Sequence, residues 1–343
     1  MGQNKNECLR EYRKVFLLIL YEMVYMVGDI ELTVLIVNYN TADLLGNCIG
    51  KLRESVKNIS HEIIIIDNAS TDESVMLLKR DFSDCELIFN DKNVGFGRAN
   101  NQCVPFIKGR YVLLLNTDAF VSEETINKTI QYMDDNERCG ILGVKLLGRD
   151  GELQPSCRYF PTPFNIFLQR TGLKKFFKEI QLVDDMAWGH DVAKQCDWVP
   201  GCYYLIRREV VDTIGLFDPR YFLYYEEVDH CFATKKAGWE VHYFSDTSVI
   251  HIGGESAKSE GGLTSSGRQL EVLQIESELL YFRKNYGQLT AMSHVLLLSL
   301  ADMIMALKKI MRGKFKLSLI PIKHACLVWT LYFKTDFATT PTR

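Results

Sequence analysis

The chain has 343 residues, with 47% hydrophobic and 24% charged side chains and a formal net charge of −3. This length accommodates one large domain with an appendage, and the composition is that of an ordinary globular protein. The small negative charge argues against a general nucleic-acid-binding protein. None of the ten cysteines forms a CxxC pair. The sequence therefore predicts no zinc site and is typical of a reducing compartment.

The first 29 residues form the first of three predicted regions. Residues 15–27 are apolar but interrupted by Glu22, and this stretch is shorter than the roughly 20 residues of a membrane-spanning helix. No clear small-residue cleavage site follows, so we expect an amphipathic or packed N-terminal helix rather than a signal peptide. The second region is an α/β domain over residues 30–255. The third, over residues 256–343, contains a flexible segment and C-terminal helices.

The first half of the α/β domain alternates short apolar strands with helices. Strands are expected at residues 33–37, 63–66, 87–89 and 111–115. Thr41 is the expected N-cap of the first helix, and residues 70–73 have the spacing of a capping box that starts the second. Apolar strands that alternate with helices predict a parallel sheet with right-handed crossovers.

Polar side chains follow three of these strands, and the carboxyl ends of parallel strands meet at one sheet edge, where ligands bind. They are Tyr39 and Asn40, Asp67 and Asn68, and Asn116 and Asp118. A carboxylate is costly to bury unpaired, and Asp118 would suit a hard cation that also holds phosphate oxygens. The alternative is that Asp118 caps the helix that starts near Ser122. We infer a nucleotide site built from several strand ends.

Two common nucleotide-binding motifs are missing. Gly95-Phe96-Gly97 follows the third strand and lacks the third glycine of the dinucleotide fingerprint. No glycine loop ends in GKS or GKT, so the sequence contains no P-loop. A plain NAD-binding fold is therefore not expected.

The second half of the domain is less regular. We expect a strand at 141–147, a proline-rich loop over the site at 151–164, an irregular segment at 171–191, a turn into a strand at 198–206, and a short helix and turn at 210–217.

A second polar group begins at Glu226. Glu226, Glu227 and Asp229 lie at the start of a helix expected over residues 227–236, with Gly238 as its stop. Acids favour this end of the helix dipole, and neighbouring carboxylates raise each other's pKa, as a general base requires. His251 ends a later strand just before a pair of glycines.

The C-terminal region contains a Ser- and Gly-rich segment at 256–267, expected as a flexible segment or lid. Helices are expected at 270–286, with Glu271, Glu276 and Arg283 facing water, and at 294–310. Residues 301–343 hold six Lys and two Arg against two Asp, a net charge of 8 − 2 = +6. An apolar helix followed by basic residues predicts docking on an anionic membrane surface. The alternative is a helix packed on the domain with a solvated basic end.

Five motifs then carry a resemblance, and they occupy residues 37–40, 66–72, 93–97, 115–118 and 224–229. As an ordered set they resemble family 2 glycosyltransferases of the GT-A fold, in particular the rhamnosyltransferase-like and galactofuranosyltransferase-like branch, over about residues 31–255. The resemblance implies an α/β fold with a mostly parallel sheet, flanking helices and a C-terminal helical extension. It also implies an inverting transfer from a nucleoside diphosphate sugar with Mg²⁺ or Mn²⁺.

The resemblance also implies roles for individual residues. The donor-binding residues it implies are Tyr39, Asn40, Asp67, Asn68, Gly95, Phe96, Arg98, Asn101 and Asn116. Asp118 would bind the metal ion, joined by His251, and Asn116 stands at the first position of the Asp-x-Asp motif. Trp198, Gly201 and Asp229 would lie on the acceptor side. Glu227 is the expected base and Glu226 the second choice, although many relatives have Asp at the second position.

The expected donor is dTDP-rhamnose or a UDP-sugar, and the expected acceptor is a saccharide or lipid-linked saccharide in cell-surface polysaccharide synthesis. The expected location is cytoplasmic, peripheral to the inner face of the plasma membrane, with no nucleic acid as partner. One alternative is an inactive sugar-nucleotide-binding or scaffold protein of the same fold. A nucleotidyltransferase is disfavoured because residues 34–40 contain no glycine. The hypothesis requires Asp118 and Glu227 to face one cleft.

Overall fold

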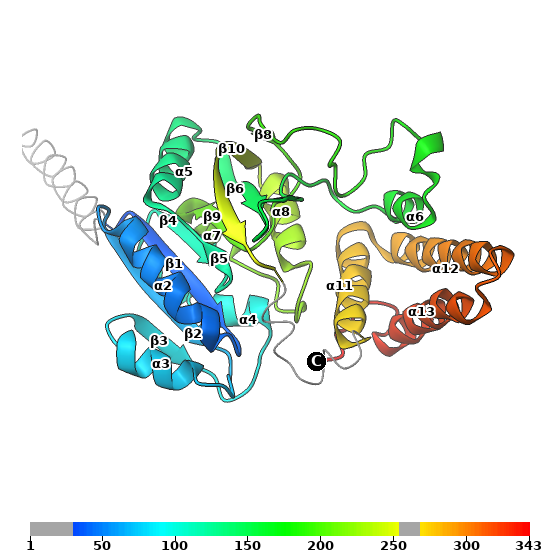
Figure 1. Ribbon diagram of the computed structural model, residues 1–343, viewed down its shortest axis with the longest axis horizontal. Coiled ribbons are helices and arrows are strands. Elements are labelled where there is room, and N and C mark those ends of the chain that lie inside the picture. Colours follow the sequence, from blue (N-terminus) through cyan, green and yellow to red (C-terminus); the bar gives the residue numbers. More distant parts are fainter. Residues whose placement is uncertain (1–29, 254–267) are drawn as a thin grey trace, which may run out of the picture.

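The computed structural model describes residues 30–253 and 268–343. An α/β unit built on one sheet is followed by helices that extend away from it (Figure 1). The expected N-terminal helix and the expected flexible segment at 256–267 lie outside the described residues.

The sheet begins with the predicted strand–helix alternation. Its strands, in spatial order, are β3 (Glu86–Phe89), β2 (His61–Asp67), β1 (Leu32–Asn38), β4 (Tyr111–Leu115), β9 (Tyr203–Arg207), β6 (Cys139–Leu147), β10 (Glu240–His251) and β5 (Ala119–Phe120). Two short strands join it at the side: β7 (Leu153–Gln154) pairs with β6, and β8 (Lys194–Gln195) pairs with β10. The strands β3, β2, β1, β4, β6 and β10 share one direction, and β9 runs antiparallel between β4 and β6. The α/β class with a mostly parallel sheet is confirmed.

Helices cover both faces of this sheet because successive strand residues point to opposite sides. One face packs against α2 (Ala42–Val56), α3 (Ser74–Asp81) and α5 (Glu123–Asp135). The other packs against α4 (Phe96–Asn101), α7 (Arg208–Ile214) and α8 (Glu226–Lys236). In β1, Val34 and Ile36 belong to the first core and Leu35 to the second.

Two predicted helix starts are wrong in detail. Thr41 precedes α2, but its hydroxyl makes no cap bond and instead donates to Asn38 Oδ1 at 2.7 Å. The capping box at 70–73 does not form, because Asp72 Oδ1 accepts from the backbone N–H of Ser74, where α3 begins. Asp118 caps no helix, since the hydroxyl of Ser122 accepts from Thr125 N at the start of α5.

The helices expected at 270–286 and 294–310 are present as α11 (Arg268–Tyr286) and α12 (Gln288–Met311). The helical segments that were not expected are α6 (Pro163–Thr171), α13 (Phe315–Lys334) and the short 3₁₀ segments η1 (Val104–Phe106) and η2 (Leu173–Phe176). The expected loop at 151–164 is thus partly wrong, because its end starts α6, which packs on α12 instead of covering the site. Glu276 does not face water as expected: it is buried and accepts from Thr342 N and Oγ1, each at 2.7 Å.

Candidate active site

The carboxyl ends of β1 and β2 are tied together by buried side chains. Asn38 Nδ2 donates to Asp67 Oδ2 at 2.7 Å and to Ser70 Oγ at 3.0 Å. Asn68 Nδ2 donates to Asn93 Oδ1 at 2.8 Å, which connects β2 to the loop before α4. Buried polar groups are stable only when they are hydrogen-bonded, so this network fixes the strand ends as a rigid edge.

Gly95 is required where the loop before α4 meets a distant segment. Its φ is +91°, and a Cβ built on it would lie 2.5 Å from the carbonyl oxygen of Phe222. The next residue, Phe96, donates its backbone N–H to the same oxygen at 3.0 Å. A glycine is needed because only it combines a positive φ with this close approach. The contact brings the loop before α4, next to the polar strand ends, close to the segment that leads into Glu226.

Asp118 follows β4 and lies beside His251 at the end of β10. Asp118 Oδ1 is 3.6 Å from His251 Nε2, and Asp118 Oδ2 accepts from Gly253 N at 3.0 Å. His251 Nδ1 lies 2.8 Å from Gln154 Oε1, which orients the ring. Burial lowers the pKa of His251, against the opposing charge of Asp118, so the imidazole is neutral at neutral pH.

The Asp118–His251 pair fits a divalent cation that takes its other ligands from phosphate oxygens and water. Mg²⁺-type sites use one or two carboxylates plus substrate phosphates, and a neutral imidazole with its other nitrogen held is a typical metal ligand. Within residues 30–253 and 268–343, no group of three or more His, Cys, Asp or Glu could hold an ion by itself. Such an ion would therefore need the substrate to complete its coordination.

Two consecutive residues with left-handed backbone conformation precede Glu226 and Glu227 and set the direction in which α8 begins. Tyr224 and Tyr225 have φ values of 70° and 68° immediately before α8. Non-glycine residues rarely adopt this conformation, and it is retained mainly at functional sites. The loop is held from behind, where Ser277 of α11 donates to the carbonyl of Leu223 at 2.9 Å. Glu226 and Glu227 therefore begin α8 in a fixed direction.

The two glutamates carry raised pKa values. Burial, and then the neighbouring Glu227, raises the pKa of Glu226 well above its usual range. Burial also raises the pKa of Glu227, but bonds to its own backbone and the charge of Arg158 oppose the shift. The Oε2 atoms of both residues are buried without a hydrogen-bond partner. The pair thus shares its charge unequally, and Glu227 is the easier one to ionise.

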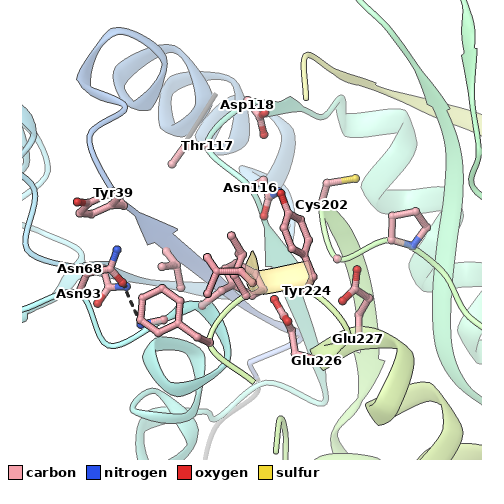
Figure 2. Close-up of a pocket in the computed structure, with 18 of the residues that line it drawn as sticks. Tyr39, Asn68, Asn93, Asn116, Thr117, Asp118, Cys202, Tyr224, Glu226 and Glu227 are labelled. Atoms are coloured by element: carbon pink, nitrogen blue, oxygen red, sulfur yellow. Dashed lines mark hydrogen bonds between the residues drawn. The ribbon is translucent and has the colours of Figure 1, made fainter. Parts of the chain in front are cut away.

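These groups surround one cavity of about 310 Å³. Figure 2 shows Asp118 on one side, Glu226 and Glu227 across from it, and Tyr39, Asn68 and Asn93 at another end. The residues predicted for the site that line the cavity are Tyr39, Asn68, Gly95, Phe96, Asn116, Asp118, Gly201, Glu226, Glu227 and His251. The common cleft required for Asp118 and Glu227 is present.

Three of the predicted donor-binding residues support the cavity from outside its wall. Asn40 Oδ1 accepts from Thr71 N at 2.6 Å. Arg98 donates to the carbonyl of Pro219 at 2.7 Å, and Asn101 both donates to and accepts from the backbone of Phe217. Arg98 and Asn101 therefore do not line this cavity, because α4 turns their side chains toward the loop at residues 217–219.

Asp67, Trp198 and Asp229 also lie away from this cavity. Both Asp67 carboxylate oxygens accept bonds from the protein, from Asn38 and from Ser70 N. Trp198 donates its indole N–H to the carbonyl of Tyr159 at 2.9 Å. Asp229 is buried and joins α8 to α11.

The contacts of Asp229 explain its role. Its carboxylate accepts from Lys284 Nζ at 2.5 Å and from Asn285 Nδ2 at 2.8 Å. Lys284 also pairs with Asp218 at 2.7 Å. A buried carboxylate with two such partners holds the helices together, so Asp229 positions the acidic helix start.

Several lining residues were not predicted as site residues. They are Val37, Asn93, Thr117, Pro200, Cys202, Phe222, Leu223, Tyr224 and Leu273. Some follow directly from the motifs, since Asn93, Thr117 and Tyr224 lie inside them. Gln154 and Arg158 act on His251 and Glu227 from a segment whose sequence carries no signal for either contact.

Comparisons with known proteins point to one family of enzymes. Residues 33–191 match the family described as Glycosyl transferase family 2. The chain is 24% identical over 209 residues to the N-acetylglucosaminyl-diphospho-decaprenol L-rhamnosyltransferase of Mycobacterium tuberculosis, over 55% of this chain and 66% of that protein. It is 26% identical over 170 residues to rhamnosyltransferase WbbL of Escherichia coli, over 46% of this chain and 60% of that protein. The chain thus spans slightly under two thirds of each of these relatives.

A solved structure shares the fold. The mannosyltransferase PcManGT from Pyrobaculum calidifontis, in complex with GDP-Man and Mn²⁺, aligns with a TM-score of 0.52 and 14% identity, over 90% of this chain and 87% of that chain. The expected GT-A fold with a C-terminal helical region is confirmed.

Proposed function

Because this chain belongs to glycosyl transferase family 2 and is of the rhamnosyltransferase-like type, we propose that it transfers a sugar from a nucleoside diphosphate sugar to an acceptor hydroxyl. The acceptor is a saccharide or lipid-linked saccharide in glycan synthesis, and the donor is dTDP-rhamnose or a UDP-sugar. One observation carries the proposal: Asp118 and His251 line the same cavity as two buried glutamates whose Oε2 atoms have no partner.

The proposed donor lies along the edge of the sheet. The nucleoside binds at Tyr39, Asn68 and Asn93, where the strand ends are held rigid. Asp118 and His251 are the residues that would hold Mg²⁺ or Mn²⁺. When bound, that ion stabilises the negative charge that develops on the leaving diphosphate.

Glu227 is the proposed base and Glu226 remains protonated beside it. The more strongly raised pKa belongs to Glu226, whereas Arg158 favours the ionised form of Glu227. Glu227 takes the proton of the acceptor hydroxyl, whose oxygen attacks the anomeric carbon as the bond to the diphosphate oxygen breaks. Because base and leaving group lie on opposite sides of that carbon, the configuration inverts.

Thermal unfolding against a panel of UDP-, dTDP-, GDP- and CMP-sugars, with and without Mn²⁺, tests the proposal. A donor at 100 times its Kd should stabilise the protein by about 2.7 kcal/mol. Asp118→Asn should lose the Mn²⁺-dependent part, while Asp43→Asn on the exposed side of α2 should behave as wild type. Donor binding without nucleotide release for any acceptor would instead identify an inactive sugar-nucleotide-binding protein.

The proposed location is the cytoplasmic membrane surface, and it rests on the outer face of the C-terminal helices. In α12 the exposed apolar side chains before the last residue, Met311, recur every three, four or seven residues at Leu289, Leu296, Leu300, Met303, Leu307 and Ile310. In α13 the exposed apolar residues are Phe315, Leu317, Leu319, Ile320, Ile322 and Phe333. We call these twelve side chains the outer apolar face. Basic residues 308, 309, 312, 314 and 316 surround the turn between the two helices, which complements anionic lipid.

The helix α12 is long and apolar enough to cross a membrane by length and composition. Its opposite face, however, carries the buried Asp302, which pairs with Arg170 of α6 at 2.5 Å and with His324 of α13 at 2.6 Å. A spanning orientation would break this network, whose buried charge needs its partners. Docking on the surface leaves it intact.

Co-flotation with vesicles tests the location. Wild type should float with phosphatidylglycerol-rich vesicles and much less with phosphatidylcholine vesicles. Met303→Glu on α12 should reduce flotation at least tenfold, while Met76→Glu on α3, which is similarly exposed, should not. Equal flotation of both variants would reject the outer apolar face as the lipid contact.

A further inference from the structure

A second cavity of about 750 Å³ lies on the other side of the acidic helix start. Its walls come from the segment around Arg158, from α6, from the first turn of α8, and from α11, α12 and α13. This volume lies within the range of about 300–1,000 Å³ that ligand pockets occupy. The proposed nucleotide and metal sites lie in the first cavity, so the second cavity has no assigned ligand.

Glu227 and Tyr224 line both cavities. The Oε2 atom of Glu227 is buried and has no hydrogen-bond partner. Glu227 as a whole is half-buried. A carboxylate between two cavities can accept a proton from a molecule in the second while the first holds a donor. Trp198, predicted for the acceptor side and absent from the first cavity, lines the second.

The charges of the second cavity leave no cation for a phosphate. Arg158 pairs with Asp184 at 2.5 Å. Arg170 and His324 both pair with the buried Asp302, at 2.5 and 2.6 Å. Glu278 is held by His294 at 2.6 Å. Arginines that already carry a carboxylate partner offer little to a second anion. The lining therefore does not favour a charged ligand.

The remaining lining groups favour an uncharged, hydroxyl-rich molecule. The aromatic side chains of Tyr224 and Tyr225 provide apolar surface, and the exposed amides of Gln169 and Gln274 can donate to and accept from hydroxyl groups. An apolar surface with a few polar groups that fix orientation is the usual design of a small-molecule site.

We propose that this second cavity is the acceptor site and that it takes neutral sugar residues. This assignment rests on the proposed function, because it requires Glu227 to act as the base. The acceptor hydroxyl gives its proton to the carboxylate of Glu227, its oxygen bonds to the anomeric carbon, and the diphosphate leaves with the electron pair. Ile320 lines the cavity and also belongs to the outer apolar face, so a saccharide carried on lipid reaches Glu227 from the membrane side.

Octyl β-glycosides of glucose, galactose, rhamnose and N-acetylglucosamine are the probes, because they join a neutral sugar to an apolar chain. Their binding is followed by ligand-observed NMR, and their turnover by nucleotide release. The test variant is Gln274→Phe, an exposed position on α11 that would fill the cavity. The matched control is Gln131→Phe, exposed on α5 and outside both cavities. Glucose 1-phosphate serves as the charged probe.

We expect at least one octyl glycoside to bind and accelerate nucleotide release, with Kd and KM raised at least tenfold in Gln274→Phe and unchanged in Gln131→Phe. Equal values in the two variants would overturn the acceptor site while leaving the proposed function intact. Binding of glucose 1-phosphate in preference to every glycoside would overturn the assignment to neutral sugars. If no nucleotide sugar binds, the proposed function fails, and the NMR arm still reports whether glycosides occupy the cavity.

Discussion

Asp118 Oδ1 lies 3.6 Å from His251 Nε2, although the two residues are 133 positions apart in the chain. The backbone reinforces this pairing, because Ile252 N donates to the carbonyl of Asp118 at 3.0 Å. Strands β4 and β10 are separated in the sheet by β9 and β6, and the short β5 after Asp118 pairs with the end of β10. The pairing of β5 with β10 therefore places the Asp118 carboxylate beside the His251 imidazole.

The first prediction concerns Asp118 itself. Asp118→Asn keeps the size of the side chain but removes the charge that a divalent cation requires. Because a metal ion contributes several kcal/mol of charge stabilisation, kcat/KM should fall by about 10³-fold. The measurement is nucleotide release against Mn²⁺ concentration. A variant with unaltered Mn²⁺ dependence would remove Asp118 from the proposed metal site.

The second prediction concerns Gln154, which contacts His251 but not the proposed ion. Its Oε1 lies 2.8 Å from His251 Nδ1, and its Nε2 donates to the carbonyl of the same residue at 2.9 Å. Loss of such an outer partner typically costs 10–100-fold in metal affinity. Gln154→Leu should therefore weaken Mn²⁺ binding by about this factor, measured by Mn²⁺ electron paramagnetic resonance with the nucleotide present. Gln154→Glu should recover much of the loss, since its carboxylate can still accept from Nδ1.

The ends of the strands could be predicted from the sequence because their pattern is local. Each strand is a short apolar run followed by polar residues. In a parallel sheet the carboxyl ends of the strands, and therefore these polar residues, lie at one edge. The acidic start of α8 is not a strand end, and its place beside Asp118 was predicted only as a requirement of the transferase hypothesis. Arg98 and Asn101 were predicted for the same site as Phe96, but they do not line the cavity. They follow Phe96 by two and five positions along a helix, and side chains at these spacings point to other sides.

The C-terminal part was harder to predict for different reasons. α13 contains Pro321, which normally argues against a helix interior, and its apolar residues face two environments. The link between Arg158 and Glu227 joins positions 69 residues apart, and it arises only when the segment around β7 folds against α8. Long-range contacts of single side chains leave no periodic signal in one sequence.

The third prediction separates the two glutamates. If Glu227 is the base, Glu227→Gln should lower kcat by about 10²–10⁴-fold with little change in donor Kd. Glu226→Gln should lose far less, because a protonated Glu226 is already neutral and its pKa lies well above the usual range. The measurement is kcat by nucleotide release and donor Kd by calorimetry. The opposite ranking of the two variants would assign the base to Glu226.

The fourth prediction concerns the pH dependence of the rate. The charge of Arg158 lowers the pKa of Glu227, against the larger effect of burial, and a base must be ionised to act. In Arg158→Met the pKa of Glu227 should rise, so the acidic limb of the kcat/KM profile should move to higher pH, with the greatest loss at low pH. Arg158→Lys keeps the positive charge, so the acidic limb of its kcat/KM profile should lie at the same pH as in wild type. A uniform loss across the pH range would indicate a structural effect alone.

The fifth prediction links Glu226 to stability. Its pKa in the folded protein is raised, chiefly by burial. The folded protein therefore binds more protons than the unfolded chain between the two pKa values, so the free energy of unfolding falls as pH rises through that window. Above the folded pKa the full penalty of the buried charge is present; below the unfolded pKa it is absent.

Glu226→Gln removes this penalty, because its side chain carries no charge at any pH. Its Tm should exceed that of wild type by a few degrees at pH 8, and the difference should shrink toward zero near pH 4, where the wild-type side chain is neutral in both states. Calorimetric scans at both pH values measure the effect, with Glu54→Gln on the exposed side of α2 as the control. An identical difference at pH 4 and pH 8 would mean that packing, rather than the buried charge, decides the stability of this helix start.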